Sequence, residues 1–330
     1  MIKDVKKNSI ILLAITAIIL YFLLKDDFSN IFTALVNSNI AVILFCLLLT
    51  IGYYSFKCLS IFLIIKNNNS TISFKKALQQ TIIVQFFNGV TPFATGGQPM
   101  HIYMLSKEKI ETSKATSSVL MDFLSYQVAI ILYCFVTLLI DYLLNIFSGN
   151  MLARKLVFLG FAINLFVCLV ASLVCFSSKV TSYIVKLISK IIRNKEKTEK
   201  LKVKVLEFHA GTKIFIKNKP LFIKCILLNI VGLTFYYLVP FFVSYAVTGN
   251  FGVSVLNSIV SSSYVFLVGA FVPIPGGSVG VEYGFTQFFG KYFAQSELLA
   301  ILLLWRFITY YFGIILGGIL LSFYKRGESK

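Results

Sequence analysis

Charged residues are scarce in this sequence. Only 13% of the 330 residues are Asp, Glu, Lys or Arg, whereas an ordinary soluble domain has roughly 25%. Hydrophobic residues make up 58% of the chain, and apolar runs such as 10–24, 40–56 and 300–321 approach or exceed the roughly 20 residues needed to cross about 30 Å of hydrocarbon. These runs are continuous rather than alternating, which excludes a transmembrane β-barrel. The sequence predicts an all-α polytopic membrane protein.

Several chemical motifs are also missing. None of the six cysteines forms a CxxC pair, and His101 and His209 have no Cys or carboxylate at ligand spacing, so we expect no metal site. No Ser/His/Asp or Cys/His arrangement is visible, and we assign no catalytic residue and no cofactor. No GxxxxGK[ST] motif is present, so any driving force for transport must come from a gradient, metabolic pull or a partner.

Positive charge is abundant but unevenly distributed. The formal net charge is +18, and Ser178–Pro220 holds twelve Lys or Arg residues against three Glu residues. Residues 57–79 add four lysines and no acid. Basic loops beside apolar spans are typical of the cytoplasmic side of a membrane protein, and they do not indicate a nucleic-acid partner. We therefore expect a cytoplasmic basic loop at 178–220.

The charge pattern orients the spans. Lys3, Lys6 and Lys7 precede the first apolar run, which lacks a small-x-small cleavage site and is interpreted as a retained signal anchor. We expect both termini in the cytoplasm of a bacterial plasma membrane. About six full spans are predicted, at residues 8–24, 40–56, 118–146, 155–177, 221–247 and 298–322.

Two further apolar segments, 81–105 and 259–289, are interrupted by proline and glycine. If the first crossed the membrane, the basic loop at 178–220 would lie outside, against the positive-inside rule. A re-entrant hairpin keeps residues 106–114 and the basic loop inside. The same argument makes 259–289 a hairpin that enters from the exterior, so we expect two broken helical hairpins that enter from opposite sides.

The two broken segments resemble each other. Pro92 precedes Gly96 by four residues, as Pro273 precedes Gly277. Gly97 precedes Tyr103 by six residues, as Gly277 precedes Tyr283. With opposite entry sides, this predicts an inverted repeat within one transmembrane domain, 1–330. Half-repeat A covers about 1–147 and half-repeat B about 154–323.

Few charges fall inside the predicted spans. Arg306 lies deep in the last span, where a charged side chain needs a partner. Glu282 is the first candidate for that partner and Asp122 the second, and the pair could be either structural or part of a substrate site. Asp141 and Lys224 lie near span ends, where we expect their charged groups to reach the interface.

The breaks are the predicted binding site. Half-helix N-termini expose N–H groups and partial positive charge, which suits an anion such as a lipid phosphate, although hairpins that only pack together would need the same prolines and glycines. His101 and Tyr103 are expected at the head-group end of the site. The candidate substrate-binding residues are Asn88, Thr91, Gly96, Gly97, Gln98, His101, Tyr103, Asp122, Gly276, Gly277, Glu282, Tyr283 and Arg306.

Three motifs carry a family resemblance: "NGVTPFATGGQPMHIYML", "VPIPGGSVGVEYGF" and "LLLWRFITYYFGIILGG". Together they resemble the lysylphosphatidylglycerol synthase transmembrane, or flippase-like, family over about residues 5–323. The resemblance implies a bacterial plasma-membrane protein related to the lipid-flipping half of the multiple peptide resistance proteins. The residues of this chain that match the family pattern are Thr91, Pro92, Gly96, Gly97, Pro99, Pro275, Gly276, Gly277, Gly280, Glu282 and Arg306.

The chain also departs from that family. Many relatives have an acidic residue and an Arg where this chain has Gln98 and His101, which leaves the charge of the ligand open. The sequence stops seven residues after Phe323, which leaves no room for the cytosolic acyltransferase domain of those relatives, so we expect none in this protein.

The leading hypothesis is that the protein translocates an anionic, aminoacylated or polyprenyl-linked lipid across the membrane. The alternatives are an enzyme that transfers lysine to phosphatidylglycerol and a secondary transporter of a small anion. Membrane lipids are the expected partners, and a homo-oligomer is compatible with the sequence.

Overall fold

The computed structural model describes residues 28–147, 151–183, 217–270 and 272–328, with isolated residues between 186 and 215. In this part of the chain the secondary structure is helical, without strands. Five stretches of helix are long and apolar enough to span a membrane. They are α3 (Ile40–Asn67), α6 (Thr112–Leu144), α7 (Met151–Phe176), α10 (Lys219–Thr248), and the run α13 (Gln295–Arg306), η3 (Phe307–Tyr311) and α14 (Phe312–Glu328).

These stretches correspond to five of the six predicted spans. The first predicted span, 8–24, and most of the basic loop at 178–220 lie outside the described residues. The short helix α2 (Phe28–Val36) precedes α3, and Asn39 caps the start of α3 by accepting hydrogen bonds from Ala41 N and Val42 N. The sequence therefore predicted the class and the approximate positions of these spans.

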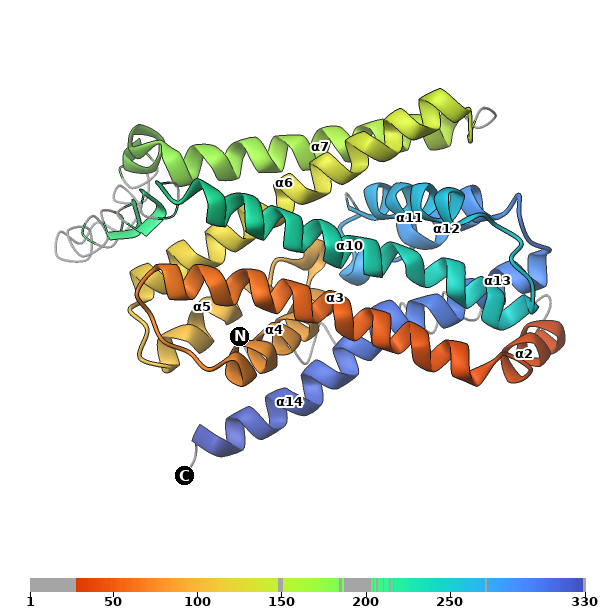
Figure 1. Ribbon diagram of the computed structural model, residues 1–330, viewed down its shortest axis with the longest axis horizontal. Helices are drawn as coiled ribbons and strands as arrows, with labels where there is room; N and C mark the ends of the chain where they lie inside the picture. Colours follow the sequence, from red (N-terminus) through yellow and green to blue (C-terminus); the bar gives the residue numbers. More distant parts are fainter. Residues whose placement is uncertain are drawn as a thin grey trace.

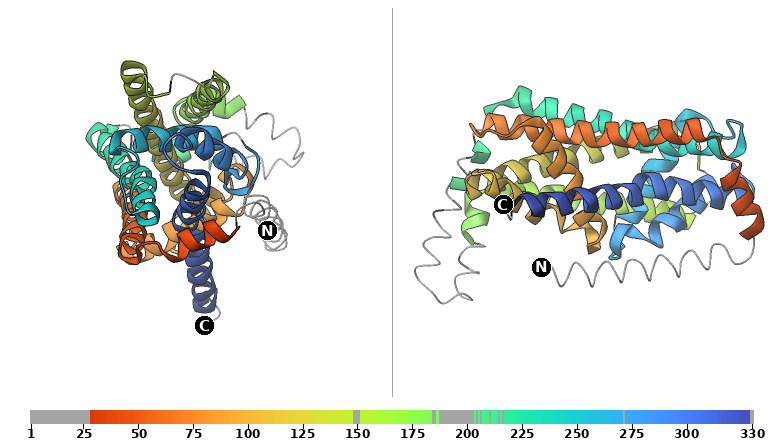
Figure 2. Two further views of the ribbon diagram at one scale, coloured as in Figure 1. Left: turned by 90° about the vertical axis from the view of Figure 1, so that its right-hand side faces the viewer. Right: turned by 90° about the horizontal axis from the view of Figure 1, so that it is seen from below.

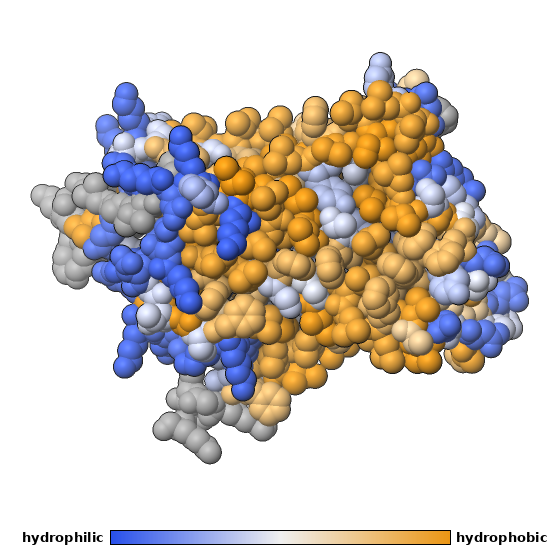
Figure 3. Space-filling view, in the orientation of Figure 1, coloured by the Kyte–Doolittle hydropathy of each residue, from blue (hydrophilic) through white to orange (hydrophobic). Residues whose placement is uncertain are grey.

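The surface agrees with a membrane environment. The long helices run along one axis of the molecule (Figures 1 and 2), and a broad apolar belt separates two hydrophilic ends (Figure 3). Large apolar side chains such as Leu48, Phe135 and Phe166 are more than half exposed on α3, α6 and α7. A continuous exposed apolar surface of this kind is stable against lipid, not water.

Two hairpins do not cross the molecule. One is α4 (Phe74–Gly89), η1 (Pro92–Ala94) and α5 (Gly97–Lys107), and the other is α11 (Val255–Gly269), η2 (Pro275–Gly277) and α12 (Gly280–Phe289). The α4–α5 hairpin opens toward the end of the molecule that holds the C-terminus, and the α11–α12 hairpin opens toward the opposite end (Figure 1). The turns η1 and η2 contact each other. Each of the two predicted broken segments therefore folds into a helical hairpin.

We call residues 90–96 the first break and residues 272–279 the second break. Their backbones match closely: Thr91 has φ −119° and ψ 143°, and Ile274 has φ −116° and ψ 144°. A proline follows each, and the next two residues have positive φ, at Phe93 and Ala94 in one break and Gly276 and Gly277 in the other.

The predicted alignment of the two breaks is wrong by two residues. Pro92 corresponds to Pro275 and not to Pro273, and Gly97 corresponds to Gly280, the first residue of the following helix. The sequence comparison used Gly96 as an anchor, but Gly96 has an ordinary helical φ of −79°. Pro92 and Pro275 begin the two turns because the proline ring fixes φ. Gly97 and Gly280 are glycines because neighbouring side chains approach them closely.

Lys57 does not lie in a loop. The predicted span ended at residue 56, but α3 continues to Asn67 and Lys57 lies inside it. Its ammonium lies 4.0 Å from the centre of the Tyr126 ring on α6. A cation over an aromatic ring is attracted to the ring quadrupole, which lets the helix carry this charge without ending.

Asp141 also differs from expectation. It is buried, and its carboxylate accepts hydrogen bonds from the Tyr264 hydroxyl at 2.7 Å and from Phe147 N at 2.9 Å. The side chain therefore does not reach toward the interface. It joins α11 and the end of α6 in the interior, because a buried carboxylate needs donors that the neighbouring helix supplies.

Candidate functional site

Arg306 contacts the second break. Its Nε lies 3.0 Å from Oε1 of Glu282, an ion pair between two largely buried side chains. Nη1 donates to the Gly276 carbonyl at 3.2 Å, and Nη2 donates to the Ser278 hydroxyl at 3.0 Å. Glu282 lies in the first turn of α12, where the helix dipole favours a negative charge. The predicted Arg306–Glu282 pair is present, and it ties the last membrane stretch to the second hairpin.

Tyr310 connects this pair to the first break. Its ring centre lies 4.5 Å from the Cζ atom of Arg306. Its hydroxyl donates a 2.8 Å hydrogen bond to the carbonyl of Gly89, the last residue of α4. Tyr310 also explains Gly276: a Cβ atom there would lie 2.3 Å from Tyr310 Cζ, and φ at Gly276 is +68°. Only glycine meets both requirements.

The π-helical turn η3 carries this contact. It covers Phe307–Tyr311, directly after Arg306. Single π-turns inside α-helices often mark functional positions because they displace side chains from the regular helical faces. Sequence reasoning found Arg306 but missed Tyr310, and the motif letters "WRFITYYFG" give no sign of which tyrosine faces the breaks.

Four predicted site residues lie in or directly beside the first break. Thr91 Oγ1 donates to the Phe87 carbonyl at 2.7 Å and accepts from Gly96 N at 2.9 Å, which closes the turn. A Cβ atom on Gly97 would lie 2.0 Å from Oδ1 of Asn88, so a larger residue at the start of α5 would force the Asn88 side chain to move. Asn88, Thr91, Gly96 and Gly97 therefore act together, and their break contacts the second one.

A second polar group, which we call the Lys57 cluster, lies between α3, α6 and α10. It consists of Tyr53, Lys57, Ser60, Asp122 and Tyr126. Asp122 Oδ1 accepts a 2.7 Å hydrogen bond from Ser60. The hydroxyls of Tyr53 and Tyr126 are 3.0 Å apart. Asp122 was predicted as an alternative partner of Arg306, but it belongs to this separate cluster, which sequence reasoning missed because Lys57 was assigned to a loop.

Asn229 of α10 extends the hydrogen bonding of that cluster. Its Nδ2 donates to the hydroxyls of Ser60 and Ser125, at 3.3 Å in each case. Asn229 is almost completely buried. Polar contacts between three membrane helices are expected only where the helices face each other and not the lipid.

His101 and Tyr103 do not lie together. His101 is buried, and its Nε2 has no hydrogen-bond partner among the described residues. Tyr103 is 44% exposed, and the Lys107 ammonium lies 5.5 Å from its ring centre. Residues two apart on a helix point to different faces. The predicted head-group pair is therefore divided between the interior and the outer face of α5.

Two other predicted residues have less defined roles. Gln98 is half-buried in the first turn of α5. Tyr283 is half-buried and packs against the main hydrophobic core, on the helix that carries Glu282. The structure places both beside the breaks without a side-chain contact that assigns them a function.

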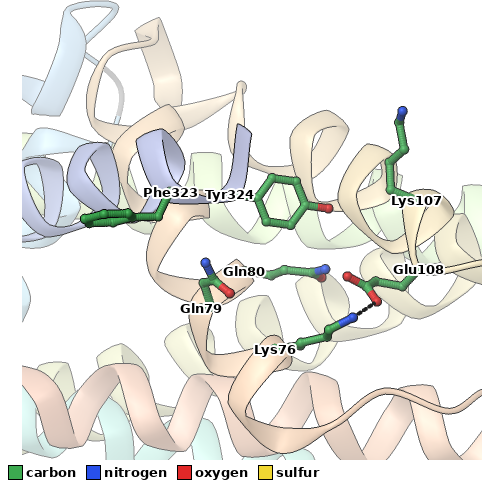
Figure 4. A pocket seen from close by; sticks show the side chains of 7 residues that line it. All are labelled: Lys76, Gln79, Gln80, Lys107, Glu108, Phe323 and Tyr324. Carbon is green, nitrogen blue, oxygen red and sulfur yellow. Dashed lines mark hydrogen bonds and ion pairs between the residues drawn. The ribbon is translucent and has the colours of Figure 1, made fainter. Parts of the chain in front are cut away.

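A pocket of about 330 Å³ opens at the hydrophilic end where α4 begins and α5 and α14 end (Figure 4). Lys76 Nζ lies 2.5 Å from Oε2 of Glu108 at this pocket. The Gln80 side chain is 1% exposed, and its amide atoms have no hydrogen-bond partner among the described residues. The lining residues are Lys76, Gln79, Gln80, Lys107, Glu108, Phe323 and Tyr324.

In the part of the chain that the structure describes, no group of three His, Cys, Asp or Glu side chains could hold a metal ion. The six cysteines are buried and unpaired. The polar chemistry of the described interior therefore comes from hydroxyls, amides, one imidazole and a few charged groups.

Comparison with known proteins agrees with the motifs. The profile of the lysylphosphatidylglycerol synthase TM region matches residues 9–317, which includes both breaks, the Lys57 cluster and Arg306. No match emerges from a comparison with curated proteins. The match covers most of the chain and indicates a function connected with membrane lipid. This multi-pass membrane protein belongs to the family of the lysylphosphatidylglycerol synthase TM region.

Proposed function

We propose that the protein moves a lipid head group across the membrane, as a flippase-like translocator. The observation that carries this proposal is the contact between two broken hairpins that enter from opposite ends of the molecule. Non-helical backbone at membrane depth is tolerated where it is buried in protein or lines a wet cavity, because unpaired N–H and C=O groups are costly in hydrocarbon. Transporters commonly place their substrate where such breaks meet.

The first break is open on one side. Pro92, Phe93, Ala94 and Thr95 are exposed, whereas in the second break Pro275 and Ser278 are buried and only its ends, Pro273 and Val279, are exposed. The second break is held by Arg306, and the first is attached to the same stretch through Tyr310 and helix packing. This asymmetry supports a mechanism in which the first hairpin moves while the second stays fixed.

The matching backbone of the breaks supports two inverted half-repeats, about 1–147 and 154–323. Alternating access in inverted-repeat transporters is a movement of one half against the other around a central site. In this mechanism the head group passes between the breaks and the acyl chains stay in the bilayer. We place the protein in a bacterial plasma membrane with both termini in the cytoplasm, because the lysine-rich loops favour that side.

The test is transport in proteoliposomes that contain only this protein. Fluorescent phosphatidylglycerol in the inner leaflet should become accessible to an external quencher faster than in empty vesicles. We expect Arg306→Ala and Glu282→Ala to abolish this transport while the variants still insert. The control, Lys155→Ala, changes an exposed residue of α7 and should transport like the wild type. Exchange no faster than in empty vesicles, for any anionic or aminoacylated lipid, would exclude the proposal.

The family description favours a second candidate, lysyl transfer to phosphatidylglycerol. Thin-layer analysis of lipids from a host that lacks aminoacylated lipid separates the two functions. A new basic lipid after expression would indicate the enzyme, and transport without a new lipid would indicate the translocator. Uptake of a small anion without lipid movement would indicate a solute transporter.

A further inference from the structure

The pocket at the hydrophilic end contains a buried amide without a partner. Gln80 of α4 lines this cavity of about 330 Å³ and is 1% exposed, and neither its Nε2 nor its Oε1 has a hydrogen-bond partner among the described residues. Buried polar side chains are usually satisfied, because taking a donor or acceptor out of water without a new partner costs free energy. A bound group that offers both a donor and an acceptor would satisfy this amide.

Three packed helices form the walls of the pocket. The first two turns of α4, the end of α5 and the end of α14 supply the side chains that line it. The same helices are joined by a hydrophobic cluster that includes Ile83, Met104 and Leu321, and Tyr324 of the pocket packs against that cluster. The pocket is therefore part of the packed helices and is not a gap between surface loops.

The ion pair between Lys76 and Glu108 borders the pocket and is accessible to water. The Lys76 side chain is 55% exposed and that of Glu108 is 18% exposed. Such a pair contributes little to stability because water screens both charges. Lys76 can therefore exchange Glu108 for another anion at a small cost. The Arg306–Glu282 pair is more deeply buried, and separating it would leave an uncompensated charge.

The charges of the pocket favour a monovalent anion. Lys76 and Lys107 are positive and Glu108 is negative, so the described lining residues have a net charge of +1. The Lys107 side chain extends away from the ion pair (Figure 4), which leaves Lys76 as the cation that an anion inside the pocket would contact. Lysine binds phosphate oxygens through charge-assisted hydrogen bonds, and a phosphodiester carries one negative charge.

The amides of the pocket ask for more than a phosphate. A phosphodiester only accepts hydrogen bonds, whereas Gln80 Oε1 needs a donor. A hydroxyl group can both donate to Oε1 and accept from Nε2. Gln79 places a second amide in the lining. The combination of one ammonium and two amides fits a phosphate that carries a small polyol.

The position of the pocket favours a lipid as the source of this group. The apolar stretch Gln295–Tyr324 is long enough to span a membrane, and its last two residues, Phe323 and Tyr324, line the pocket. Phe323 is 59% exposed. On this face the hydrophilic end adjoins the apolar belt (Figure 3). A head group in the pocket would therefore have an apolar surface beside it for its acyl chains.

We infer that this pocket binds the polyol phosphate head group of an anionic phospholipid, at a site separate from the two breaks. The phosphate pairs with Lys76, which leaves Glu108, and the hydroxyls bond to the amide of Gln80. The site holds whether or not the lipid is transported. A soluble polyol phosphate has the same polar chemistry, so the probes must distinguish the two sources.

The experiment is calorimetric titration of the purified full-length protein in detergent. The probes are dihexanoyl phosphatidylglycerol, dihexanoyl phosphatidylcholine, which is zwitterionic and has no hydroxyl, and free glycerol 3-phosphate. We expect Lys76→Ala to raise the Kd for phosphatidylglycerol about tenfold, as for a lost hydrogen bond to a charged group. Glu108→Gln should lower this Kd by up to about fivefold, because the competing carboxylate is gone. Both other probes should bind about tenfold more weakly than phosphatidylglycerol.

Gln80→Leu separates a ligand-binding role from a structural one. Leucine is similar in size and removes a buried amide that has no partner among the described residues, so the midpoint of thermal unfolding should not fall. The Kd for phosphatidylglycerol should rise about fivefold, because the hydrogen bonds to the head group are lost. The matched control is Lys75→Ala, which removes an exposed lysine beside Lys76 that does not line the pocket. It should change the Kd less than about twofold.

Wild-type affinity for phosphatidylglycerol in folded Lys76→Ala and Gln80→Leu variants would overturn the inference. A lower unfolding midpoint for Gln80→Leu would assign the amide to helix packing and overturn its role in binding. Equal affinity for phosphatidylcholine would show that the acyl chains alone bind, and tighter binding of glycerol 3-phosphate would exclude the lipid source. Transport without this binding would leave the proposed function intact, and binding without transport would leave only the pocket.

Discussion

The hydroxyl of Tyr310 donates a 2.8 Å hydrogen bond to the carbonyl of Gly89, a residue 221 positions earlier in the chain. The same tyrosine ring lies over the guanidinium of Arg306, which is bonded to Gly276 and Ser278. One π-helical turn therefore contacts both broken hairpins. A displacement of either hairpin must change the environment of Tyr310 and Arg306.

Tyr310→Phe should destabilise the junction without changing its shape. The variant removes one hydrogen bond and leaves the Gly89 carbonyl without that donor, which costs about 1–3 kcal/mol. We expect a lower midpoint of thermal unfolding in detergent. Tyr142→Phe is the control, because Tyr142 is 76% exposed on α6. Equal midpoints for Tyr310→Phe and the wild type would mean that the hydrogen bond does not contribute to stability.

Gly97→Ala should disturb the first break through a steric clash, because the new Cβ atom would lie 2.0 Å from Oδ1 of Asn88. Overpacking of this kind costs about 1–3 kcal/mol. The second substitution Asn88→Ala removes the atom that clashes, so the double variant should recover part of the lost stability. Gly318→Ala, whose Cβ atom would meet only ordinary contacts at 3.5 Å, should unfold like the wild type. Failure of Asn88→Ala to rescue Gly97→Ala would contradict the proposed clash.

Arg306 and Glu282 should depend on each other. Removing one member of a buried ion pair costs about 3–5 kcal/mol because the remaining charge is uncompensated. Arg306→Gln and Glu282→Gln should each reduce stability strongly, and the double variant should lose less than the sum of the two losses. The measurement is a double-mutant cycle by denaturant or thermal unfolding. Additive losses would show that the 3.0 Å contact carries no coupling energy.

The two ends of the molecule should face opposite sides of the membrane. In a background without the six native cysteines, Lys114→Cys lies beside the α4–α5 hairpin and Phe251→Cys lies in the loop between α10 and α11. We expect an impermeant maleimide to label Phe251→Cys in intact cells and Lys114→Cys only after permeabilisation. Labelling of both positions from one side would contradict the re-entrant course of the hairpins.

The sequence by itself determined the class of the protein and the approximate positions of five membrane-length stretches and two broken hairpins. Hydrocarbon imposes a minimum length on apolar helices, so composition alone predicted the spans. Proline and glycine interrupt helices through local backbone geometry, and lysine-rich loops indicate the cytoplasmic side of the membrane. The two hairpins were therefore also predictable. The pairing of Arg306 with Glu282 was predicted because a charge in a membrane needs a partner and few acidic residues were available.

Only the tertiary structure decided which groups each charged side chain contacts. Sequence counting identified Arg306 as the candidate cation, but the fold directs its nitrogens to Gly276, Ser278 and Glu282. Lys57 was assigned to a loop because a lysine usually ends an apolar run. In the structure the helix continues past it, and its ammonium lies over the ring of Tyr126 on another helix. Helical periodicity acts over a few residues, whereas contacts such as Tyr310 with Gly89 depend on how distant helices pack. For that reason, the sequence located the breaks, and the packing decided how each charge beside them is used.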